Sequence, residues 1–262
     1  MALTLQTDAI VLRSIRYGEA DRILHLYTFD RGRVSAIAKG ARRTRSRFGA
    51  RLEPFFQVRL SLHEGRGDLY TVTGADTIDA RAGLRESAAA LDAAARACDA
   101  VARLFETGDP HPEVFTLLAN ELTLLAGAGA TRGAPSGDRV RAGTAPLSHA
   151  GPANALAFRL KLLLAAGIVP QLGSCVSCGE REHLGGFSAS AGGVVCRSCE
   201  AAAFTLEEDA YRFLIDALGR PLADAPQASA RALRQAERAI RETAEHHAHV
   251  RLRPVALAES AS

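Results

Sequence analysis

Hydrophobic and polar residues alternate in short runs through the first 80 residues of the chain. In the run QVRLSLH, polar residues separate the apolar residues Val58, Leu60 and Leu62, which is the pattern of a strand with one buried face. Similar runs are TDAIVLRSI, RILHLYTF, RVSAIAK and LYTVTGADTI, and turn signals such as RYGEAD and DRG follow the first two of them. Five short strands in about 75 residues predict a small antiparallel barrel or sandwich over residues 1–80.

From about residue 83 the hydrophobic period lengthens from two residues to about 3.6, which is the period of an α-helix. Apolar residues spaced by three and four predict one long helix, and they are Leu84, Ala88, Leu91, Ala95, Cys98, Ala102 and Phe105. On this apolar face, we interpret Cys98 as a small core residue. Helical patterns recur in EVFTLLANELTLLAGAG and NALAFRLKLLLAAG, so we expect an α-helical domain over residues 81–262.

Two more helices are predicted near the end of the chain. Thr205 and Glu208 have the spacing of a capping box, which predicts a helix that begins there. The last helix is expected from about Ser229 to His249. Residues 127–152 consist mostly of Gly, Ala, Pro, Ser and Thr without a period, and this composition is typical of a flexible insertion.

Four of the five cysteines form two CxxC pairs in the arrangement C-x2-C-x17-C-x2-C. Four soft ligands suit a tetrahedral Zn²⁺, and glycines between the pairs allow a β-hairpin. The pattern predicts one zinc ion per chain, held in a module over residues 173–202 by Cys175, Cys178, Cys196 and Cys199. Four protein ligands leave no open position, so the metal is expected to be structural. A dithiol redox pair and a degenerate, metal-free knuckle are the alternatives.

Positive charge is concentrated near the start of the chain. The first 74 residues contain 13 Lys and Arg against 7 Asp and Glu, whereas the remainder contains 19 against 22. The densest segment is KGARRTRSRFGAR, residues 39–51, which contains no acid. Such a run is often a solvated loop, but between strands of a small barrel it favours an oligonucleotide-binding (OB) fold. The residues expected to contact DNA are Lys39, Arg42, Arg43, Arg45, Arg47, Arg51 and Phe48.

Contact with the phosphates and contact with the bases make different demands on this segment. Six phosphate contacts would give a log–log dependence of affinity on salt with a slope of about −4 to −5. Binding to single strands would also need an aromatic surface on which bases stack. Phe48 is the aromatic residue within the segment, where it either stacks on a base or anchors the loop. Tyr17, Tyr27 and Tyr70 are further candidates, and each fits the hydrophobic core at least as well.

No other pattern in the sequence predicts catalysis. The chain lacks G-x-x-x-x-G-K-[ST], G-x-S-x-G and HExxH, so we expect neither an ATP-driven motor nor another enzyme. His246, His247 and His249 are interpreted as exposed residues at a helix end, where they complement the helix dipole. The sequence also lacks the features of a signal peptide or a membrane span, which predicts a cytoplasmic protein with no membrane partner.

Two segments of the chain resemble a known family. Residues 17–55, YGEADRILHLYTFDRGRVSAIAKGARRTRSRFGARLEPF, resemble the N-terminal signature of the RecO family of bacterial recombination mediators. AFRLKLLLAAGIVPQLGSCVSCG followed by GGVVCRSC is similar to the central segment of that family. The resemblance covers nearly the whole chain, and residues 127–152 and the last ten residues are its weak parts.

The resemblance implies an α+β multidomain protein with an N-terminal five-stranded OB-fold barrel, an α-helical domain and a four-cysteine zinc module. It implies binding of single-stranded (ssDNA) and double-stranded DNA (dsDNA), annealing of complementary strands, and action with RecR to load RecA onto DNA coated with single-strand-binding protein (SSB). RecF is a further candidate partner, and the expected location is the nucleoid. The competing hypothesis is an OB-fold adaptor that binds an acidic protein surface and has little DNA binding of its own. A zinc-dependent nucleic-acid enzyme is a third alternative, which the closed four-thiolate site disfavours.

Overall fold

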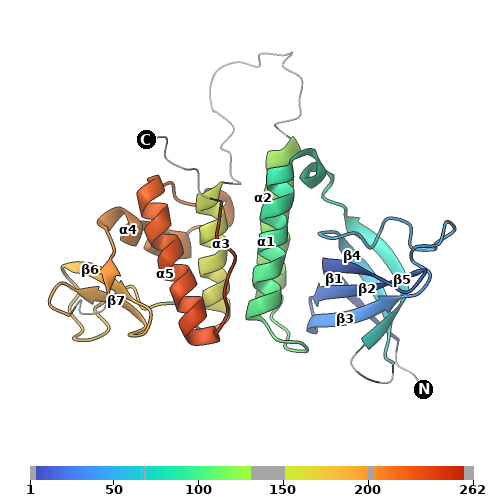
Figure 1. The fold of residues 1–262 in the computed structure, drawn as a ribbon, viewed down its shortest axis with the longest axis horizontal. Helices are drawn as coiled ribbons and strands as arrows, with labels where there is room; N and C mark the ends of the chain where they lie inside the picture. The colour runs from blue at the N-terminus through green and yellow to red at the C-terminus, as the bar shows by residue number, and fades with distance from the viewer. Residues whose placement is uncertain (1–3, 66, 68, 131–150, 200–202, 257–262) are drawn as a thin grey trace, which may run out of the picture. The chain divides into compact units, whose positions relative to one another are not determined.

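The computed structural model describes residues 4–65, 67, 69–130, 151–199 and 203–256 of the chain. The chain divides into two compact units, Met1–Gly133 and Ala134–Ser262, which are described separately. The first unit contains a β-barrel followed by helices, and the second contains helices and a small sheet (Figure 1). No helix within the described ranges has the length and hydropathy that a bilayer crossing needs. The domain division predicted at residues 80 and 81 stays a prediction.

Five strands close the barrel of the first unit. They are β1 (Thr4–Tyr17), β2 (Asp21–Thr28), β3 (Gly32–Ala38), β4 (Gln57–His63) and β5 (Leu69–Asp79). Their order is β1-β2-β3-β5-β4, and β4 pairs with β1 to complete the circle. The β3–β5 pair is parallel, whereas the other neighbouring pairs are antiparallel. The predicted five-stranded OB-fold barrel is therefore confirmed.

The alternation of residues along the strands decides which side chains fill the barrel. On β4, Val58, Leu60 and Leu62 are fully buried, whereas Arg59 is exposed. Inward-facing apolar residues from all five strands form one core cluster. Each large apolar side chain that is removed from water stabilises the fold by about 1.5–3 kcal/mol. A shift of one residue in the register would turn these side chains outward, so the core fixes the strand pairing.

The helical pattern that follows the barrel forms two elements instead of the one long helix predicted from residue 83. A 3₁₀ turn, η1 (Ala82–Glu86), contains Leu84, and α1 (Ala88–Leu104) begins after it. Ser87 separates them because its extended backbone (φ −142°) breaks the helix, while its hydroxyl accepts a 3.3 Å hydrogen bond from the amide of Ala90 as an N-cap.

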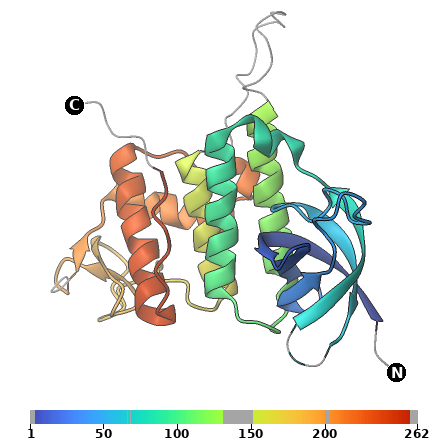
Figure 2. The same ribbon diagram turned by 45° about the vertical axis from the view of Figure 1, so that its right-hand side comes forward.

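The helix α2 (Pro112–Ala130) lies beside α1 in the first unit (Figure 2). Cys98 on α1 is buried, as predicted for a core residue, and burial raises the pKa of its thiol to about 12. The predicted insertion at 127–152 lies largely outside the described residues, although α2 continues into its start.

A buried arginine links the end of the barrel to α2. Arg81 has a left-handed backbone (φ 44°), and its side chain is 1% exposed. Its guanidinium donates hydrogen bonds to the carbonyl of Phe55 (2.7 Å), to Oε1 of Gln57 (3.0 Å) and to the carbonyl of Ala119 (3.4 Å). These bonds compensate part of the cost of burying the charge. Nothing in the sequence pattern distinguished this arginine from the exposed ones.

In the second unit, helices pack beside a three-stranded sheet. The helices are α3 (Pro152–Ala165), α4 (Glu208–Gly219) and α5 (Ala230–Ala248), with a 3₁₀ turn η2 (Leu222–Asp224). The strands are β6 (Leu184–Ser188), β7 (Gly193–Cys196) and β8 (Phe204–Thr205), in the order β7-β6-β8. The predicted hairpin between the CxxC pairs and the predicted last helix are confirmed. Ser229 caps α5 by accepting a 3.2 Å hydrogen bond from the amide of Ala232.

The predicted capping box at Thr205 is wrong. Thr205 belongs to β8, where it pairs with Gly186 of β6. The N-cap of α4 is Glu207, which has an extended backbone and makes no side-chain capping bond. Pairing with a distant strand holds Thr205 outside the helix, and this contact is not visible in the local sequence.

Candidate nucleic-acid interface and metal centre

The basic segment forms the connection between β3 and β4. We call residues 39–51 the basic loop; it leaves the barrel between these strands (Figure 1). Successive turns build it, with backbone bonds from the amide of Arg43 to the carbonyl of Gly40 (3.1 Å) and from Ser46 to Arg43 (2.9 Å). Gly40 has φ 69°, a conformation that glycine adopts with little strain. The loop therefore has a defined backbone path.

Phe48 anchors the basic loop to the barrel. Its ring is 0% exposed and belongs to the barrel core together with Leu52 and Phe56. The guanidinium of Arg47 lies 4.8 Å from the ring centroid, a cation–π contact. Of the two roles that the sequence leaves open for Phe48, this burial favours the anchor, because a DNA base cannot stack on a ring with no exposed surface.

The six cationic residues of the basic loop are all exposed, and they are Lys39, Arg42, Arg43, Arg45, Arg47 and Arg51. In the part of the chain that the structure describes, no carboxylate forms an ion pair with any of them. Their positive charge is therefore available to an external anion. This is the electrostatic arrangement that a phosphate backbone requires.

The six side chains fall into two groups by their contacts. Those of Arg42, Arg47 and Arg51 donate hydrogen bonds of 3.1–3.4 Å to backbone carbonyls, which stiffens the loop. Within the described ranges, the side chains of Lys39, Arg43 and Arg45 form no hydrogen bond or ion pair. The second group has its full donor capacity free.

The β1–β2 turn supports the start of the basic loop. Gly40 donates its amide to Oδ1 of Asp21 (2.8 Å), and Arg42 donates its amide to the carbonyl of Ala20 (2.8 Å). The guanidinium of Arg42 also reaches the carbonyl of Gly18 (3.3 Å). These three bonds join the loop to a turn about 20 residues earlier in the chain. The supporting role of Asp21 was missed from the sequence, where its position in a turn was the only signal.

Four further arginines flank the basic loop in sequence. Arg13 and Arg16 on β1 are exposed. Arg22, by contrast, binds Ser14 (3.0 Å) and Glu53 (3.1 Å). Arg33 donates to the carbonyl of Ala102 and to the hydroxyl of Thr107. The structure thus leaves Arg13 and Arg16 available to a ligand, while Arg22 and Arg33 have structural partners.

The four cysteines of the two CxxC pairs lie together in the second unit. The sulfur atoms of Cys175, Cys178, Cys196 and Cys199 all lie within 4.8 Å of one another. The sulfurs of Cys178 and Cys196 are 3.7 Å apart. In a tetrahedral site with four Zn–S bonds of about 2.3 Å, two sulfurs lie about 3.8 Å apart. The donor set and its size therefore fit a tetrahedral metal ion. His183 is not part of the cluster, although it stands between the pairs.

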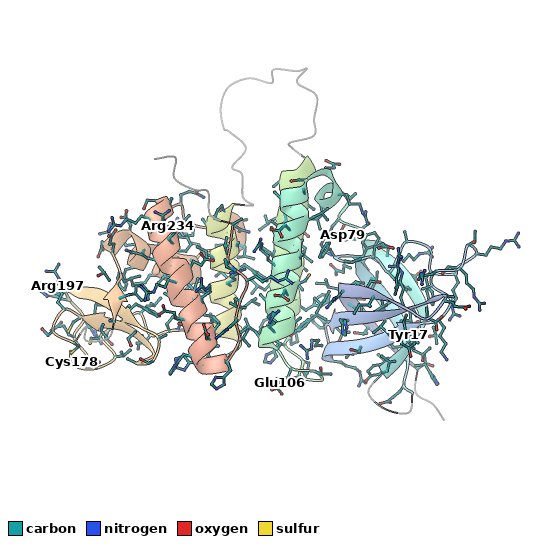
Figure 3. All side chains as sticks on the ribbon, viewed as in Figure 1. Tyr17, Asp79, Glu106, Cys178, Arg197 and Arg234 are labelled. Carbon is teal, nitrogen blue, oxygen red and sulfur yellow. The ribbon has the colours of Figure 1, made fainter. Side chains whose placement is uncertain are left out.

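The local backbone explains how the cysteines come together. Each CxxC pair forms a tight turn, in which Gly179 donates to the carbonyl of Cys175 (2.8 Å) and Cys199 donates to that of Cys196 (2.9 Å). The hairpin of β6 and β7 closes the distance between the two turns. Cys178, labelled in Figure 3, is exposed, whereas Cys175 is buried, with 2% of its surface exposed.

The electrostatics of the cluster also favour a cation. Backbone amides, that of Cys196 first, lower the pKa of Cys175 to about 6. The neighbouring sulfurs of Cys178 and Cys196 raise the pKa of Cys199 to about 12. The thiolate form of Cys175 is thus stabilised, whereas neighbouring sulfurs destabilise the thiolate form of Cys199. A metal ion among the sulfurs offsets the repulsion between neighbouring thiolates, because its positive charge allows all four ligands to be deprotonated.

The histidines near the C-terminus lie at the end of α5, as predicted. His246 and His247 occupy its last turn, and His249 ends it with a left-handed backbone (φ 56°). His247 also lies 2.9 Å from the carbonyl of Ala189 through Nε2. Neither His246 nor His249 belongs to a metal-type cluster in the described ranges.

The described residues thus combine a closed OB-fold barrel that carries an exposed cationic loop with helices and a four-cysteine module. Two family models match this chain: one described as Recombination protein O N terminal matches residues 1–81, and one described as Recombination protein O C terminal matches residues 147–254. The chain therefore belongs to the RecO family.

Curated relatives support the family assignment. The chain is 40% identical to the DNA repair protein RecO of Rubrobacter xylanophilus over 92% of its own length and 90% of the relative. It is 34% identical to the DNA repair protein RecO of Myxococcus xanthus over 73% of its length and 71% of the relative. The same name applies to a relative from Bifidobacterium animalis that is 40% identical over 72% of the chain and 71% of the relative. The family assigns the chain to DNA repair and recombination.

Proposed function

We propose that this protein binds ssDNA and dsDNA through the basic loop, anneals complementary strands and, together with RecR, promotes the loading of RecA onto SSB-coated DNA. The observation that carries the proposal is the set of six exposed cations on one barrel loop with no carboxylate partner in the described residues. Membership of the RecO family supports the same role. SSB and RecF are the further proposed partners, and the protein works in the nucleoid as a mediator without a catalytic step.

Annealing requires that two phosphate backbones approach each other despite their mutual repulsion. Cations on a protein surface displace the counterions of both strands and hold the strands close, without reading their sequence. The basic loop offers this charge in one place. Its sequence-independent contacts suit a protein that acts on any pair of complementary strands.

Within the basic loop, we assign phosphate contacts first to Lys39, Arg43 and Arg45. Their side chains have no partners in the described part of the chain. Arg42, Arg47 and Arg51 already bind backbone carbonyls, so their larger role is to hold the loop in shape. Their remaining N–H groups still face solvent and add to the local positive potential.

We also propose that Cys175, Cys178, Cys196 and Cys199 hold one zinc ion per chain. The sulfur separations support this assignment, as derived above. With four protein ligands, zinc would cross-link the two CxxC turns and stabilise the hairpin between them, with no open position for a substrate. The proposed role is therefore structural.

The experiment that tests DNA binding measures affinity for labelled oligonucleotides across a range of salt concentrations. The wild-type protein is expected to give a log–log slope of about −4 to −5. Replacing Lys39, Arg43 and Arg45 by alanine should reduce the magnitude of the slope by about 2–3, because each lost phosphate contact removes about 0.7–0.9.

A matched control removes the same charge elsewhere. Arg212, Arg220 and Arg251 are exposed arginines in ion pairs of the second unit, and their triple replacement by alanine should leave the slope unchanged. Equal effects of the two triple variants on the slope would show that net charge, and not the position of the cations in the basic loop, decides the salt dependence. A wild-type protein that binds neither ssDNA nor dsDNA at low salt would contradict the proposal and favour the protein adaptor.

A further inference from the structure

Tyr17 is an exposed aromatic residue at the end of β1. Its side chain is 57% exposed, and it is labelled on the barrel in Figure 3. In the described part of the chain, Phe29 is the other exposed aromatic residue, at 46%. The ring of Phe29 packs edge-on against Phe115 with a centroid distance of 5.6 Å. Tyr17 therefore presents the larger free aromatic surface to solvent.

The other aromatic candidates of the first unit are covered. Phe48 and Tyr27 are 0% exposed, and Tyr70 is partly buried against the barrel core. The same packing that buries Phe48 and Tyr27 leaves Tyr17 outside the core. A sequence pattern could not separate the three tyrosines, because all of them lie in or next to strand-like runs.

Hydrogen bonds place Tyr17 next to the basic loop. Tyr17 pairs with Asp21 across the β1–β2 hairpin, and the carboxylate of Asp21 accepts the amide of Gly40, the second residue of the loop. The residue after Tyr17, Gly18, accepts a hydrogen bond from the guanidinium of Arg42. Tyr17 and the start of the basic loop, with Arg42, are thus attached to the same turn.

The charges around Tyr17 suit a nucleotide. Arg16 precedes it on β1 and is exposed, as is Arg42 in the basic loop. Of the two nearby acids, Asp21 is occupied by the amide of Gly40, while Glu19 is exposed in the turn. An exposed ring on the turn that Arg42 contacts matches a base that stacks while its flanking phosphates are neutralised by the basic loop.

We propose that Tyr17 is a stacking platform for an unpaired base of ssDNA whose phosphates lie on the basic loop. The inference rests on the proposed DNA binding and specifies which form of DNA this part of the site selects. Bases in a duplex are stacked inside the helix and cannot lie flat on the ring. When a complementary strand pairs with the base, this contact ends and only the phosphate contacts remain, which helps to release an annealed duplex.

The first test compares the affinities of two variants for oligothymidine and for a duplex of equal length. Tyr17→Ala should weaken binding to oligothymidine by roughly 5- to 150-fold, since stacking on an aromatic residue contributes on this scale. Tyr17→Phe should bind like the wild type because it keeps the ring. Neither change should alter affinity for the duplex or the salt slope, since no phosphate contact is lost. Equal losses for oligothymidine and the duplex would overturn the stacking role.

The second test uses a spectroscopic signal that does not depend on affinity. The chain contains no tryptophan, so Tyr17→Trp places a single reporter at this position. Bound oligothymidine should quench its fluorescence, whereas an abasic oligonucleotide of the same length should bind through phosphates without this quenching. The same response to both oligonucleotides, or no quenching at saturation with oligothymidine, would overturn the inference.

The two proposals fail in different ways. If the wild-type protein binds no DNA at low salt, both proposals are overturned. If the wild type binds ssDNA with the expected salt slope but Tyr17→Ala binds equally well and the Tyr17→Trp reporter is not quenched, DNA binding stands and the role of Tyr17 is rejected.

Discussion

At the scale of residues, burial separates two aromatic side chains that the sequence places in similar settings. Phe48 lies within the basic loop, yet its ring is part of the barrel core. Tyr17 lies outside the loop, yet its side chain is more than half exposed and is attached to the loop through the β1–β2 turn. The hydrophobic anchor and the aromatic surface are therefore different residues. Proximity in sequence to the cations is a poor guide to which ring is exposed.

Replacing Phe48 tests its role as an anchor. Phe48→Ala should lower the free energy of unfolding by about 3–5 kcal/mol, because it removes buried apolar surface and leaves a cavity in the barrel. Phe48→Leu retains most of the buried volume and should cost less. Urea denaturation followed by circular dichroism measures both effects.

DNA affinity distinguishes the anchor from a stacking residue at Phe48. Where the protein remains folded, Phe48→Leu should keep its affinity for oligothymidine, since no base contacts the buried ring. A stable Phe48→Leu variant with selectively weakened ssDNA binding would contradict the anchoring role.

At the scale of elements, close packing joins the β2–β3 turn to the α1–α2 connection. Gly32 begins β3 with φ +61°, and a Cβ built on it would lie 1.9 Å from the carbonyl oxygen of Asp109. The amide of Gly108 donates to the carbonyl of Arg33 (3.0 Å). The guanidinium of Arg33 binds the same connection through Thr107. These contacts fix the barrel and its helices as parts of one unit.

Gly32→Ala is expected to destabilise the first unit by about 2–4 kcal/mol. A left-handed backbone costs an L-residue about 1–2 kcal/mol, and forced overpacking costs about 1–3 kcal/mol. Gly18→Ala is a matched control, because Gly18 has a similar φ of +52° but no atom within 4 Å of an added Cβ. It should cost only the backbone part. Comparable losses of unfolding free energy in urea for both variants would show that the contact with Asp109 does not matter.

At the scale of the whole molecule, the barrel and the cysteine module differ in the size of their apolar clusters. The barrel has an extensive apolar core that includes residues of all five strands. The cysteine module has a small cluster built around Cys175, Val195 and Cys196. A short hairpin with so little apolar surface gains much of its stability when a metal cross-links it. The cysteines thus lie in a part of the chain with only a small apolar cluster.

Removal of the metal tests this contrast. Purified protein should contain about one zinc per chain by mass spectrometry, and a strong chelator should lower the thermal midpoint of unfolding because the bound ion stabilises the folded module. Cys178→Ser should reduce the zinc content. Cys98→Ala changes a buried cysteine outside the cluster and should leave it unchanged. Protein with well under one metal per chain, or with a thermal midpoint insensitive to chelation, would refute the zinc assignment.

The sequence predicted those features whose causes are local or periodic. The strand period, the helix period from residue 88 onward and the glycine-rich hairpin between the cysteine pairs follow from side-chain spacing. Thr205 and Leu84 departed from expectation because distant or neighbouring contacts decided their conformations. Thr205 pairs with β6, and Leu84 lies in a 3₁₀ turn that Ser87 separates from α1. Such contacts can override a local sequence pattern, and the pattern itself carries no information about them.

The sequence by itself determined the barrel and helical regions, the excess of cations at residues 39–51 and the four metal-type ligands, because hydrophobic period, charge and ligand spacing are properties of the chain. The tertiary structure decided which side chains are free to act. It buried Phe48, engaged Arg33 and Arg81 in structural bonds, and left Lys39 and Tyr17 exposed. Burial and hydrogen-bond partners depend on residues that are far apart in the sequence, so they are fixed only when the chain has folded.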